Sequence, residues 1–396
     1  MCKIKNILFS VFVGFFLTPI SLSAELKPLQ KWMESLVESE KVVGCMAQIT
    51  QGGKTIFLEA VGDRSPNSEE DLSVDQIVRI YSMSKAITSV AAMQLIERGE
   101  LGLDDPVALY IPEFSEMQVF VEGKLEPLQR PINIRDLLLH TSGLAYGFSA
   151  LPELLSHYEN TFVEIETLED AAKKIATLPL AHQPGTTFTY GLNTDVLGRV
   201  VEVVAEKDFG VYLQEHIFRP LSMRDTSFSE NKIQKYMPIV KHVEGTLVID
   251  TEHYDNPGRI FDPYFESGGG GLWSTLHDYT RLCMSLEQLG MLDGHRILRE
   301  ETVKFMMQNQ ISPGTDSTGI GWGPRFGIGF VICDGVDTKA GLLGEDRWSW
   351  AGAASTFFFI DPSQDLTAVF ATQLFPFNRN MNDEFHQVVL ESIASE

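Results

Sequence analysis

The stretch Ser82-Met-Ser-Lys85 is the most informative part of this chain. It places a hydroxyl and an amine three residues apart, just before a mostly apolar run at 86–93 that predicts a buried helix. Positions i and i+3 share one face of a helix, so the amine of Lys85 can reach the hydroxyl of Ser82. Serine needs a neighbouring base to act as a nucleophile, and this spacing supplies one without a histidine. The helix N-terminus adds positive potential where an oxyanion would form.

The same spacing occurs a second time, in Ser229-Glu-Asn-Lys232. That copy lies in a polar stretch with no apolar helix behind it, so we interpret it as an exposed loop. For Ser82 the alternative to catalysis is a helix-capping serine followed by a surface lysine.

Length, composition and charge exclude several classes of function. The chain has 396 residues and is 44% hydrophobic, which is enough for one large domain or two closely joined ones. It carries 31 Lys and Arg against 54 Asp and Glu, a formal net charge of −23. This balance argues against a nucleic-acid partner and against adsorption to anionic membranes.

The first residues predict an export signal. Lys3 and Lys5 precede an apolar run at 7–22, and small residues follow where cleavage would occur. We therefore expect 1–24 to be a signal peptide and the mature protein to be periplasmic or secreted, without a stable membrane anchor. The alternative is an uncleaved anchor, but the run is short for a bilayer span and contains Pro19.

The cysteines do not form a metal motif. Removal of the signal leaves Cys45, Cys283 and Cys333, an odd number without Cys-x-x-Cys spacing. We expect buried free thiols, while a disulfide between two of the three stays open. The sequence also leaves the oligomeric state open.

Strand patterns occur at both ends of the chain. Near the N-terminus a helical pattern precedes two strand-like runs at 42–50 and 55–61, joined by a turn. Near the C-terminus the expected strands are 326–333, 347–350, 355–360 and 366–374, followed by a helix at about 381–393. These patterns predict an α+β fold with one antiparallel sheet formed from both chain ends and flanked by helices.

The middle of the chain is mostly helical. Helix candidates are 84–98, 134–139, 168–178, 196–205, 211–218 and 274–289. We therefore expect a sheet part at 25–80 and 300–396 and a mostly helical inserted domain at 81–299, within one overall domain at about 30–390. A cleft between the two parts is a common place for an active site.

Several separated segments resemble class C β-lactamase-like serine hydrolases. They are Ser82-Met-Ser-Lys85, Glu97-Arg-Gly-Glu-Leu-Gly-Leu-Asp-Asp-Pro-Val107, Ile134-Arg-Asp-Leu-Leu-Leu-His-Thr-Ser-Gly-Leu144, Gln183-Pro-Gly-Thr186 with Tyr190, and Ile217-Phe-Arg-Pro-Leu-Ser-Met223. They follow the family's order over nearly all of the mature chain. The resemblance implies a β-lactamase/transpeptidase-like fold and Ser82 and Lys85 as catalytic residues.

The family's second catalytic element is a tyrosine, usually in Tyr-x-Asn. The literal match, Tyr158-Glu-Asn160, lies in a polar stretch, and we interpret it as a chance occurrence. Tyr190 has the matching context, although Leu192 occupies the asparagine position and Asn193 is displaced by one. The resemblance implies that Tyr190 shares the proton transfers with Lys85 and that Asn193 contacts substrate. The alternative is a core tyrosine.

The third element in β-lactamases is Lys-Thr-Gly on a strand beside the cleft. Lys339-Ala-Gly341 lies in a polar loop, and Trp350-Ala-Gly-Ala353 matches the strand better. The resemblance then implies that Trp350, Ala351 and Gly352 bind substrate and that the backbone N–H groups of Ser82 and Ala353 form the oxyanion hole. The alternative is a core tryptophan.

A tryptophan in place of that lysine, and a tyrosine without its asparagine, resemble the family VIII carboxylesterases. We therefore expect a serine hydrolase that cleaves small acyl esters through an acyl-enzyme, with no metal or organic cofactor and no nucleic-acid partner. The alternatives are a β-lactamase, a D-alanyl-D-alanine peptidase and, as a non-enzyme, a penicillin-recognising or cell-wall-binding protein. Transfer of the acyl group to an alcohol or amine also stays open.

Two other features are weaker candidates. The run from Gly268 to Gly271 lacks the Gly-Lys-Ser/Thr of a phosphate-binding loop and predicts a turn beside the cleft. In the family's pattern the segment containing His140 is structural, so we do not assign His140 a catalytic role.

Overall fold

A computed structural model describes residues 26–66, 68, 70–158, 161–162, 165–228, 236–251, 265–321, 323–333, 336–337, 342–343 and 347–394. The predicted signal peptide at 1–24, the second Ser-x-x-Lys at 229–232 and the Lys-Ala-Gly at 339–341 lie outside the described residues.

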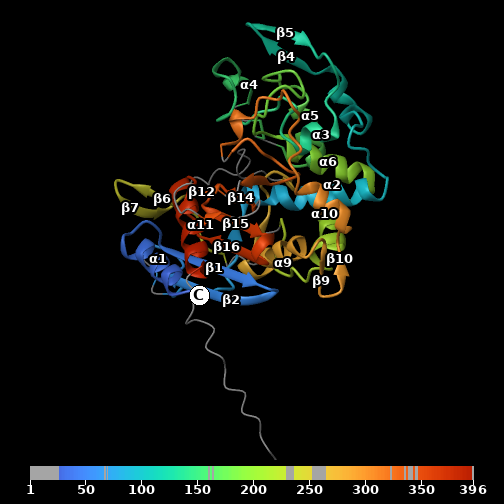
Figure 1. The fold of residues 1–396 in the computed structure, drawn as a ribbon. Helices are drawn as coiled ribbons and strands as arrows, with labels where there is room; N and C mark the ends of the chain where they lie inside the picture. Colours follow the sequence, from blue (N-terminus) through green and yellow to red (C-terminus); the bar gives the residue numbers. More distant parts are fainter. Residues whose placement is uncertain are drawn as a thin grey trace, which may run out of the picture.

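The main element is an antiparallel sheet built from both ends of the chain. Its strands, in spatial order, are β11 (Val331–Cys333), β14 (Arg347–Gly352), β15 (Thr356–Asp361), β16 (Leu366–Ala371), β1 (Gly44–Gln51) and β2 (Lys54–Gly62). The N- and C-terminal strands meet where β1 pairs with β16, from Met46 opposite Ala371 to Gln51 opposite Leu366. The blue and red elements accordingly lie together in Figure 1. The predicted α+β class is confirmed.

Helices cover both faces of this sheet because its central strands are apolar on both sides. On one face, α1 (Lys27–Glu38) and α11 (Arg379–Ala394) pack on the sheet, with the rings of Phe370 and Phe385 5.3 Å apart. On the other face lies α9 (Leu276–Glu287), whose Tyr279 ring is 5.1 Å from that of Phe358. The helix α9 thus packs on the sheet, although its sequence lies within the stretch predicted as the helical insert.

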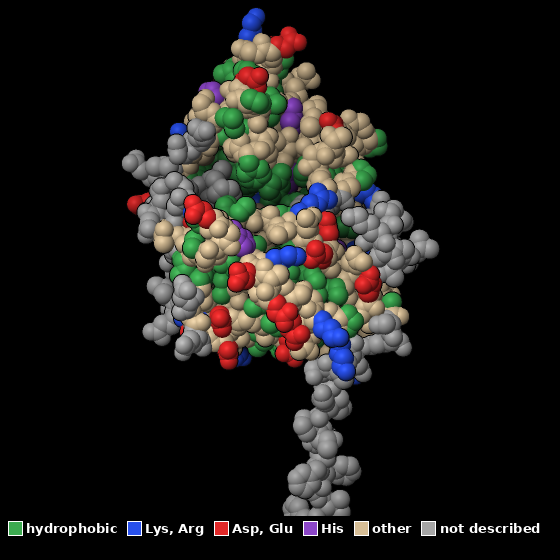
Figure 2. Space-filling model, turned by 90° about the vertical axis from the view of Figure 1, so that its left-hand side faces the viewer, with side chains coloured by type: hydrophobic (Ala, Val, Ile, Leu, Met, Phe, Trp, Pro, Cys, Tyr) green, Lys and Arg blue, Asp and Glu red, His purple; other side chains and the backbone are tan. Residues whose placement is uncertain are grey.

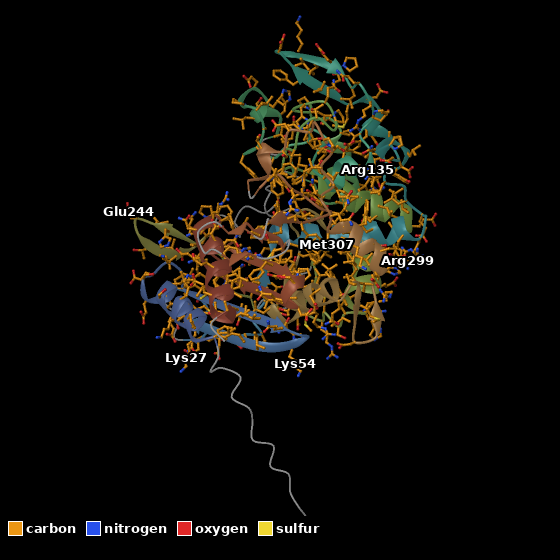
Figure 3. The ribbon with its side chains drawn as sticks, viewed as in Figure 1. Lys27, Lys54, Arg135, Glu244, Arg299 and Met307 are labelled. Carbon is orange, nitrogen blue, oxygen red and sulfur yellow. The ribbon has the colours of Figure 1, made fainter. Side chains whose placement is uncertain are left out.

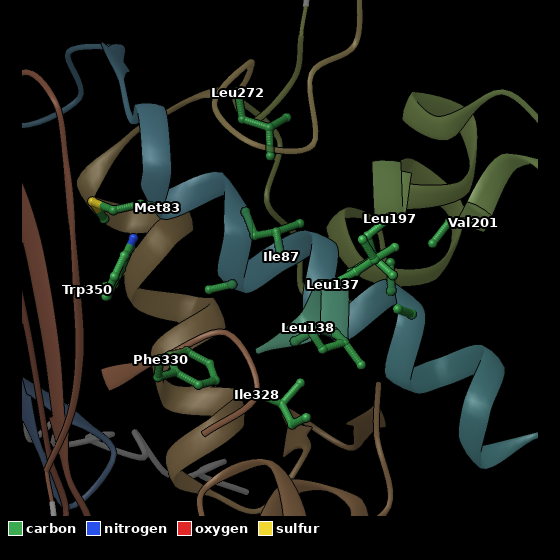
Figure 4. Close-up of a cluster of buried hydrophobic side chains, with 14 of the residues drawn as sticks. Met83, Ile87, Leu137, Leu138, Leu197, Val201, Leu272, Ile328, Phe330 and Trp350 are labelled. Atoms are coloured by element: carbon green, nitrogen blue, oxygen red, sulfur yellow. The ribbon is translucent and has the colours of Figure 1, made fainter. Parts of the chain in front are cut away.

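The helix α2 (Ser84–Glu97) runs between the sheet and the helical part. Every residue from Ser84 to Leu95 is buried, and a helix that is buried all round needs neighbours on every side. These neighbours include α3 (Ile134–Leu138) and α6 (Asn193–Ala205), and Figure 4 shows Ile87, Leu138 and Leu197 gathered where the three helices meet. The rigid packing around α2 fixes the position of its N-terminal end.

Other helices of the molecule are α5 (Leu168–Ile175), α7 (Phe209–Leu213), α10 (Glu300–Met306) and the single turn α4 (Leu155–Tyr158). Two hairpins that the sequence did not predict are β4 (Gln118–Val121) with β5 (Lys124–Pro127) and β6 (Val240–Val243) with β7 (Thr246–Ile249). Two-residue strands are β3 (Val78–Arg79), β8 (Trp273–Ser274), β9 (Met291–Leu292), β10 (His295–Arg296), β12 (Val336–Asp337) and β13 (Leu342–Leu343).

Charged side chains of both signs are scattered over the surface. Lys27, Lys54 and Glu244 project from the periphery (Figure 3), and Figure 2 shows Asp and Glu side chains spread over the lower part of one face. No helix among the described residues is long and apolar enough to cross a membrane.

Candidate active site

Ser82 lies in a strained turn directly before α2. This turn, the 3₁₀ helix η1 (Tyr81–Met83), includes Tyr81 at φ +42°, in the left-handed region that residues with a side chain rarely adopt. Such strain persists only where surrounding packing enforces it, and it is commonly found at functional sites. Here it leads the chain from β3 into α2 so that Ser82 lines a cavity.

Lys85 is buried beside Ser82, as the spacing predicted. Its side chain is in the first turn of α2, and the residue is 2% exposed. Its Nζ donates to Ser82 Oγ at 3.3 Å, to the Tyr146 hydroxyl at 3.0 Å and to the Gly269 carbonyl at 2.6 Å. These three contacts fix the amine next to the Ser82 oxygen.

Tyr146 is a site residue that the sequence analysis did not identify. Its hydroxyl contacts Lys85, its ring lines the cavity, and Nζ lies 5.2 Å from the ring centroid. Burial raises the pKa of Tyr146 well above its ordinary value, and the nearby Asp195 and Tyr190 add to the shift. The phenol is therefore neutral near pH 7. Tyr146 lies just beyond the segment that ends at Leu144, and no spacing rule marks it; only its contact with Lys85 reveals it.

Tyr190 also lies beside the amine, next to Tyr146. The Lys85 Nζ is 4.7 Å from its ring centroid, and the rings of Tyr146 and Trp350 are each 5.4 Å away. Its hydroxyl is buried and makes no hydrogen bond to the described residues. The phenol is therefore available to a substrate or to the nucleophile, although it makes no direct bond to Ser82 here.

A glycine allows the two tyrosines to approach each other. A methyl group placed on Gly191 would lie 2.2 Å from the Leu144 carbonyl oxygen and 2.6 Å from the Ala145 Cα. Only a residue without a side chain therefore fits between the segments that carry Tyr190 and Tyr146.

Tyr158, the tyrosine of the literal Tyr-x-Asn match, supports the core behind the site instead of facing the cavity. Tyr158 is buried, its hydroxyl donates to the Pro179 carbonyl at 2.9 Å, and it does not line the cavity. Glu159 and Asn160 lie outside the described residues.

The structure does not bring Asn193, which was predicted to contact substrate, into the lining of the cavity. Asn193 is 0% exposed, because it begins α6 beneath the cavity wall and faces the protein interior. Its amide nitrogen donates to His140 Nδ1 at 3.0 Å, and its oxygen accepts from the Ser142 hydroxyl at 2.5 Å. Its contacts support the wall instead of the ligand.

His140 is held neutral in this buried network. Its Nδ1 faces the N–H donors of Asn193 and Gly191, so it must act as an acceptor. Burial, together with the charge of Lys85, lowers the pKa of His140 well below its ordinary value. Its ring supports that of Tyr190 at 4.9 Å. These contacts agree with a structural role.

The C-terminal end of β14 forms another wall of the cavity. Trp350, Ala351, Gly352 and Ala353 all line the cavity with Ser82, the arrangement that the predicted oxyanion hole requires. A methyl group on Gly352 would lie 2.4 Å from the Ile80 carbonyl oxygen. The glycine therefore permits the strand to approach the Ser82 turn closely.

The cavity is large and mainly aromatic. Its volume is about 720 Å³, and its aromatic lining includes Phe148, Phe188, Phe375 and Phe377 besides Trp350 and the two tyrosines. Gly269 and Gly270 also line it, in agreement with the predicted turn beside the cleft. Among the described residues in the lining, Arg379 carries the one charged side chain. This lining suits an apolar acyl group with few polar substituents.

The described residues contain no group of three His, Cys, Asp or Glu side chains able to hold a metal. Cys45 and Cys283 are buried free thiols, and Cys333 is partly exposed, with its Sγ 3.5 Å from the Ser349 hydroxyl oxygen.

Comparison with known proteins agrees with this geometry. The sequence model of the family described as Beta-lactamase matches residues 29–391. The chain belongs to the β-lactamase family. This β-lactamase-family protein is similar to Esterase EstB of Burkholderia gladioli, with 28% identity over 382 residues that cover 91% of this chain and 92% of EstB. It is also similar to Acyltransferase calJ of Penicillium decumbens, with 28% identity over 362 residues that cover 83% of this chain and 84% of calJ.

A solved structure shows the same fold. EstCE1, described as a hydrolase with promiscuous acyltransferase activity, superposes with a TM-score of 0.78 at 24% identity, covering 93% of this chain and 97% of EstCE1. The predicted family and the predicted β-lactamase/transpeptidase-like fold are confirmed.

Proposed function

We propose that this protein is a serine hydrolase that cleaves small, mainly apolar carboxylic esters through an acyl-enzyme. The observation that carries the proposal is the contact of Lys85 with Ser82 Oγ beside two tyrosines, at the base of an aromatic cavity with Trp350 in its wall. The similarity to an esterase over most of both chains supports the same conclusion.

In the proposed reaction Ser82 Oγ attacks the ester carbonyl carbon. The serine proton passes to the cluster of Lys85, Tyr146 and Tyr190, and the oxyanion is held by the N–H groups of Ser82 and Ala353. The cluster returns the proton to the departing alkoxide. Water then attacks the acyl carbon and loses its proton to the same cluster, and the cluster returns a proton to Ser82 Oγ as the bond from Oγ to the acyl carbon breaks and the carboxylic acid leaves. Because the three groups interact closely, their protonation is coupled and belongs to the cluster as a whole.

The wall formed by β14 favours esters over β-lactams. Trp350 stands where the β-lactamases of the family carry a cationic lysine, so this wall lacks the cation that would face a β-lactam carboxylate. Its ring packs against Tyr190 and, edge-on at 5.6 Å, against Phe326. It therefore offers a rigid apolar surface to an acyl chain.

One panel of substrates tests this function. p-Nitrophenyl acetate and butyrate, nitrocefin and a D-Ala-D-Ala peptide are compared for wild type, Ser82→Ala and the surface variant Ser39→Ala. We expect ester turnover by wild type and Ser39→Ala, a loss of at least about 10³-fold in Ser82→Ala, and a mass increase of one acyl group on the Ser82 peptide after rapid quenching. Fast nitrocefin or peptide turnover without ester turnover would overturn the assignment, and stable acylation without turnover would favour the non-enzymatic alternative.

Acyl transfer is a second candidate, favoured by the size of the cavity. A volume of about 720 Å³ leaves room for an acceptor alcohol beside a short acyl chain, and the aromatic lining disfavours water. The similarity to an acyltransferase agrees with this. Product analysis with p-nitrophenyl butyrate and added primary alcohols distinguishes ester formation from hydrolysis.

We further propose that the protein is exported. The support is the basic start at Lys3 and Lys5 followed by the apolar run at 7–22. Cell fractionation and N-terminal sequencing of the mature protein test this; a cytoplasmic protein that retains its first residues would contradict it.

A further inference from the structure

A buried carboxylate, Asp195, lies beneath the site and has no role in the reaction described above. It is in the first turn of α6 and is 1% exposed. Its Oδ1 accepts hydrogen bonds from the Ser267 hydroxyl at 2.5 Å and from the Gly269 N–H at 3.1 Å. Burying a carboxylate costs free energy unless it is paired and hydrogen-bonded, so the buried position of Asp195 requires a physical explanation.

Gly269 connects this carboxylate to the catalytic amine. Its N–H donates to Asp195, while its carbonyl accepts from Lys85 Nζ at 2.6 Å, the shortest contact of the amine. A methyl group on Gly269 would lie 2.5 Å from Asp195 Oδ2 and 3.0 Å from the Tyr146 hydroxyl oxygen. The turn is therefore clamped between the carboxylate below it and the amine and phenol above it.

We propose that Asp195 is a positioning residue for the acyl-enzyme chemistry, with two effects. It holds the Gly269 carbonyl against Lys85, which keeps the amine beside Ser82. Its negative charge also sets the pH at which the cluster of Lys85, Tyr146 and Tyr190 can take the proton from Ser82. The inference rests on the proposed function.

The charges around the cluster give the direction of the second effect. The groups that face it are Lys85 from α2, Tyr146 and His140 from the segment after α3, and Tyr190 from the segment before α6. His140 is neutral and Tyr146 is a neutral phenol near pH 7, so we assign the negative charge beside this cluster to the carboxylate of Asp195, which contacts the Gly269 N–H. A buried anion favours the protonated cluster, and its removal should make the free base available at lower pH.

Opposing influences act on the pKa of the Asp195 carboxyl group. Burial raises the pKa of Asp195, but the charge of Lys85 and the hydrogen bonds from Ser267 and Gly269 act in the opposite direction.

The variant Asp195→Asn separates the two effects, because an amide oxygen can still accept both hydrogen bonds but carries no charge. The measurement is kcat/KM for p-nitrophenyl acetate between pH 5 and 10, together with the rate at which a fluorophosphonate modifies Ser82, followed by intact mass. We expect the acidic limb of both profiles to move to lower pH by roughly one unit. No movement, or movement to higher pH, would overturn the electrostatic effect.

A matched control is available in α9. Asp278 is also a buried first-turn aspartate, and its Oδ2 accepts a backbone N–H from Asp225 and the Thr226 hydroxyl. It does not line the active-site cavity. Asp278→Asn should leave the acidic limb of both pH profiles, for ester turnover and for Ser82 modification, at its wild-type position. An equal shift in this variant would show that the effect is not specific to Asp195.

The positioning effect is tested by Asp195→Ala and Gly269→Ala. Both should lower kcat and the rate of Ser82 modification by about 10- to 100-fold with little change in KM, and Asp195→Asn should restore most of the rate lost in Asp195→Ala. Wild-type rates in folded Gly269→Ala would overturn the positioning effect even if Asp195→Asn did not fold.

Modification of Ser82 without ester turnover would refute the proposed function but still test Asp195, whereas an unreactive Ser82 in wild type would refute both.

Discussion

Replacing Tyr146 by phenylalanine should separate its hydroxyl from its ring. The ring would keep its contact with Phe148 at 5.2 Å and its place beside Lys85, so the cavity wall should stay intact. What is lost is the 3.0 Å hydrogen bond between the Lys85 amine and the phenol oxygen. Of the three contacts that fix Nζ, those to Ser82 and Gly269 would remain.

The size of the effect follows from the charge of the donor. A hydrogen bond to a charged group contributes about 1.5–3 kcal/mol, twice or more the contribution of a neutral one. One factor of ten in rate corresponds to about 1.4 kcal/mol. If the bond is fully used in the transition state, Tyr146→Phe should therefore lower kcat/KM for p-nitrophenyl acetate by about 10- to 150-fold, with the loss mainly in kcat.

A second tyrosine provides the control. Tyr212 is also buried, its hydroxyl accepts from the Arg98 guanidinium at 2.8 Å, and the cation lies 5.9 Å from its ring centroid. Because Tyr212 is outside the cavity, Tyr212→Phe should not lower kcat/KM. It should lower thermal stability by about as much as Tyr146→Phe does. Equal kcat/KM values in wild type and Tyr146→Phe, with both variants folded, would refute the claim that the phenol holds the catalytic amine.

Two further predictions concern the cavity wall and the pH dependence of stability. Gly352→Ala places a methyl group 2.4 Å from the Ile80 carbonyl oxygen, so it should push β14 away from the Ser82 turn. We expect kcat to fall at least about 10-fold and the free energy of unfolding to fall by about 1–3 kcal/mol. An unchanged kcat would contradict the predicted oxyanion hole. The depressed pKa of His140 means that below pH 6.5 the unfolded chain takes up a proton that the folded protein does not. The free energy of unfolding should therefore be highest above that pH and fall as the pH decreases, by at most about 1.4 kcal/mol per pH unit for this group. Denaturant unfolding at pH 7.5 and 5.5 should show a smaller fall for His140→Gln, although His182, whose pKa is also lowered by burial, would keep part of it.

The sequence by itself determined the fold and the centre of the site. The strand patterns at the two chain ends predicted one antiparallel sheet because short runs rich in apolar residues, bounded by turn residues, are local signals. The i, i+3 spacing placed Lys85 beside Ser82 because a helix fixes that distance regardless of the rest of the fold. The hairpins β4–β5 and β6–β7 escaped prediction because their strands are short and largely exposed.

Only the tertiary structure decided which groups join that pair. Tyr146, Gly269 and Asp195 lie 61, 184 and 110 positions from Lys85 in the sequence, yet each contacts the amine or its hydrogen-bond partner. Asn193 shows the reverse, since a position close to the family's pattern faces the interior because it begins a packed helix. Spacing fixes neighbours only within one helix or strand, and the neighbours of a buried charge are set by which segments the core brings together.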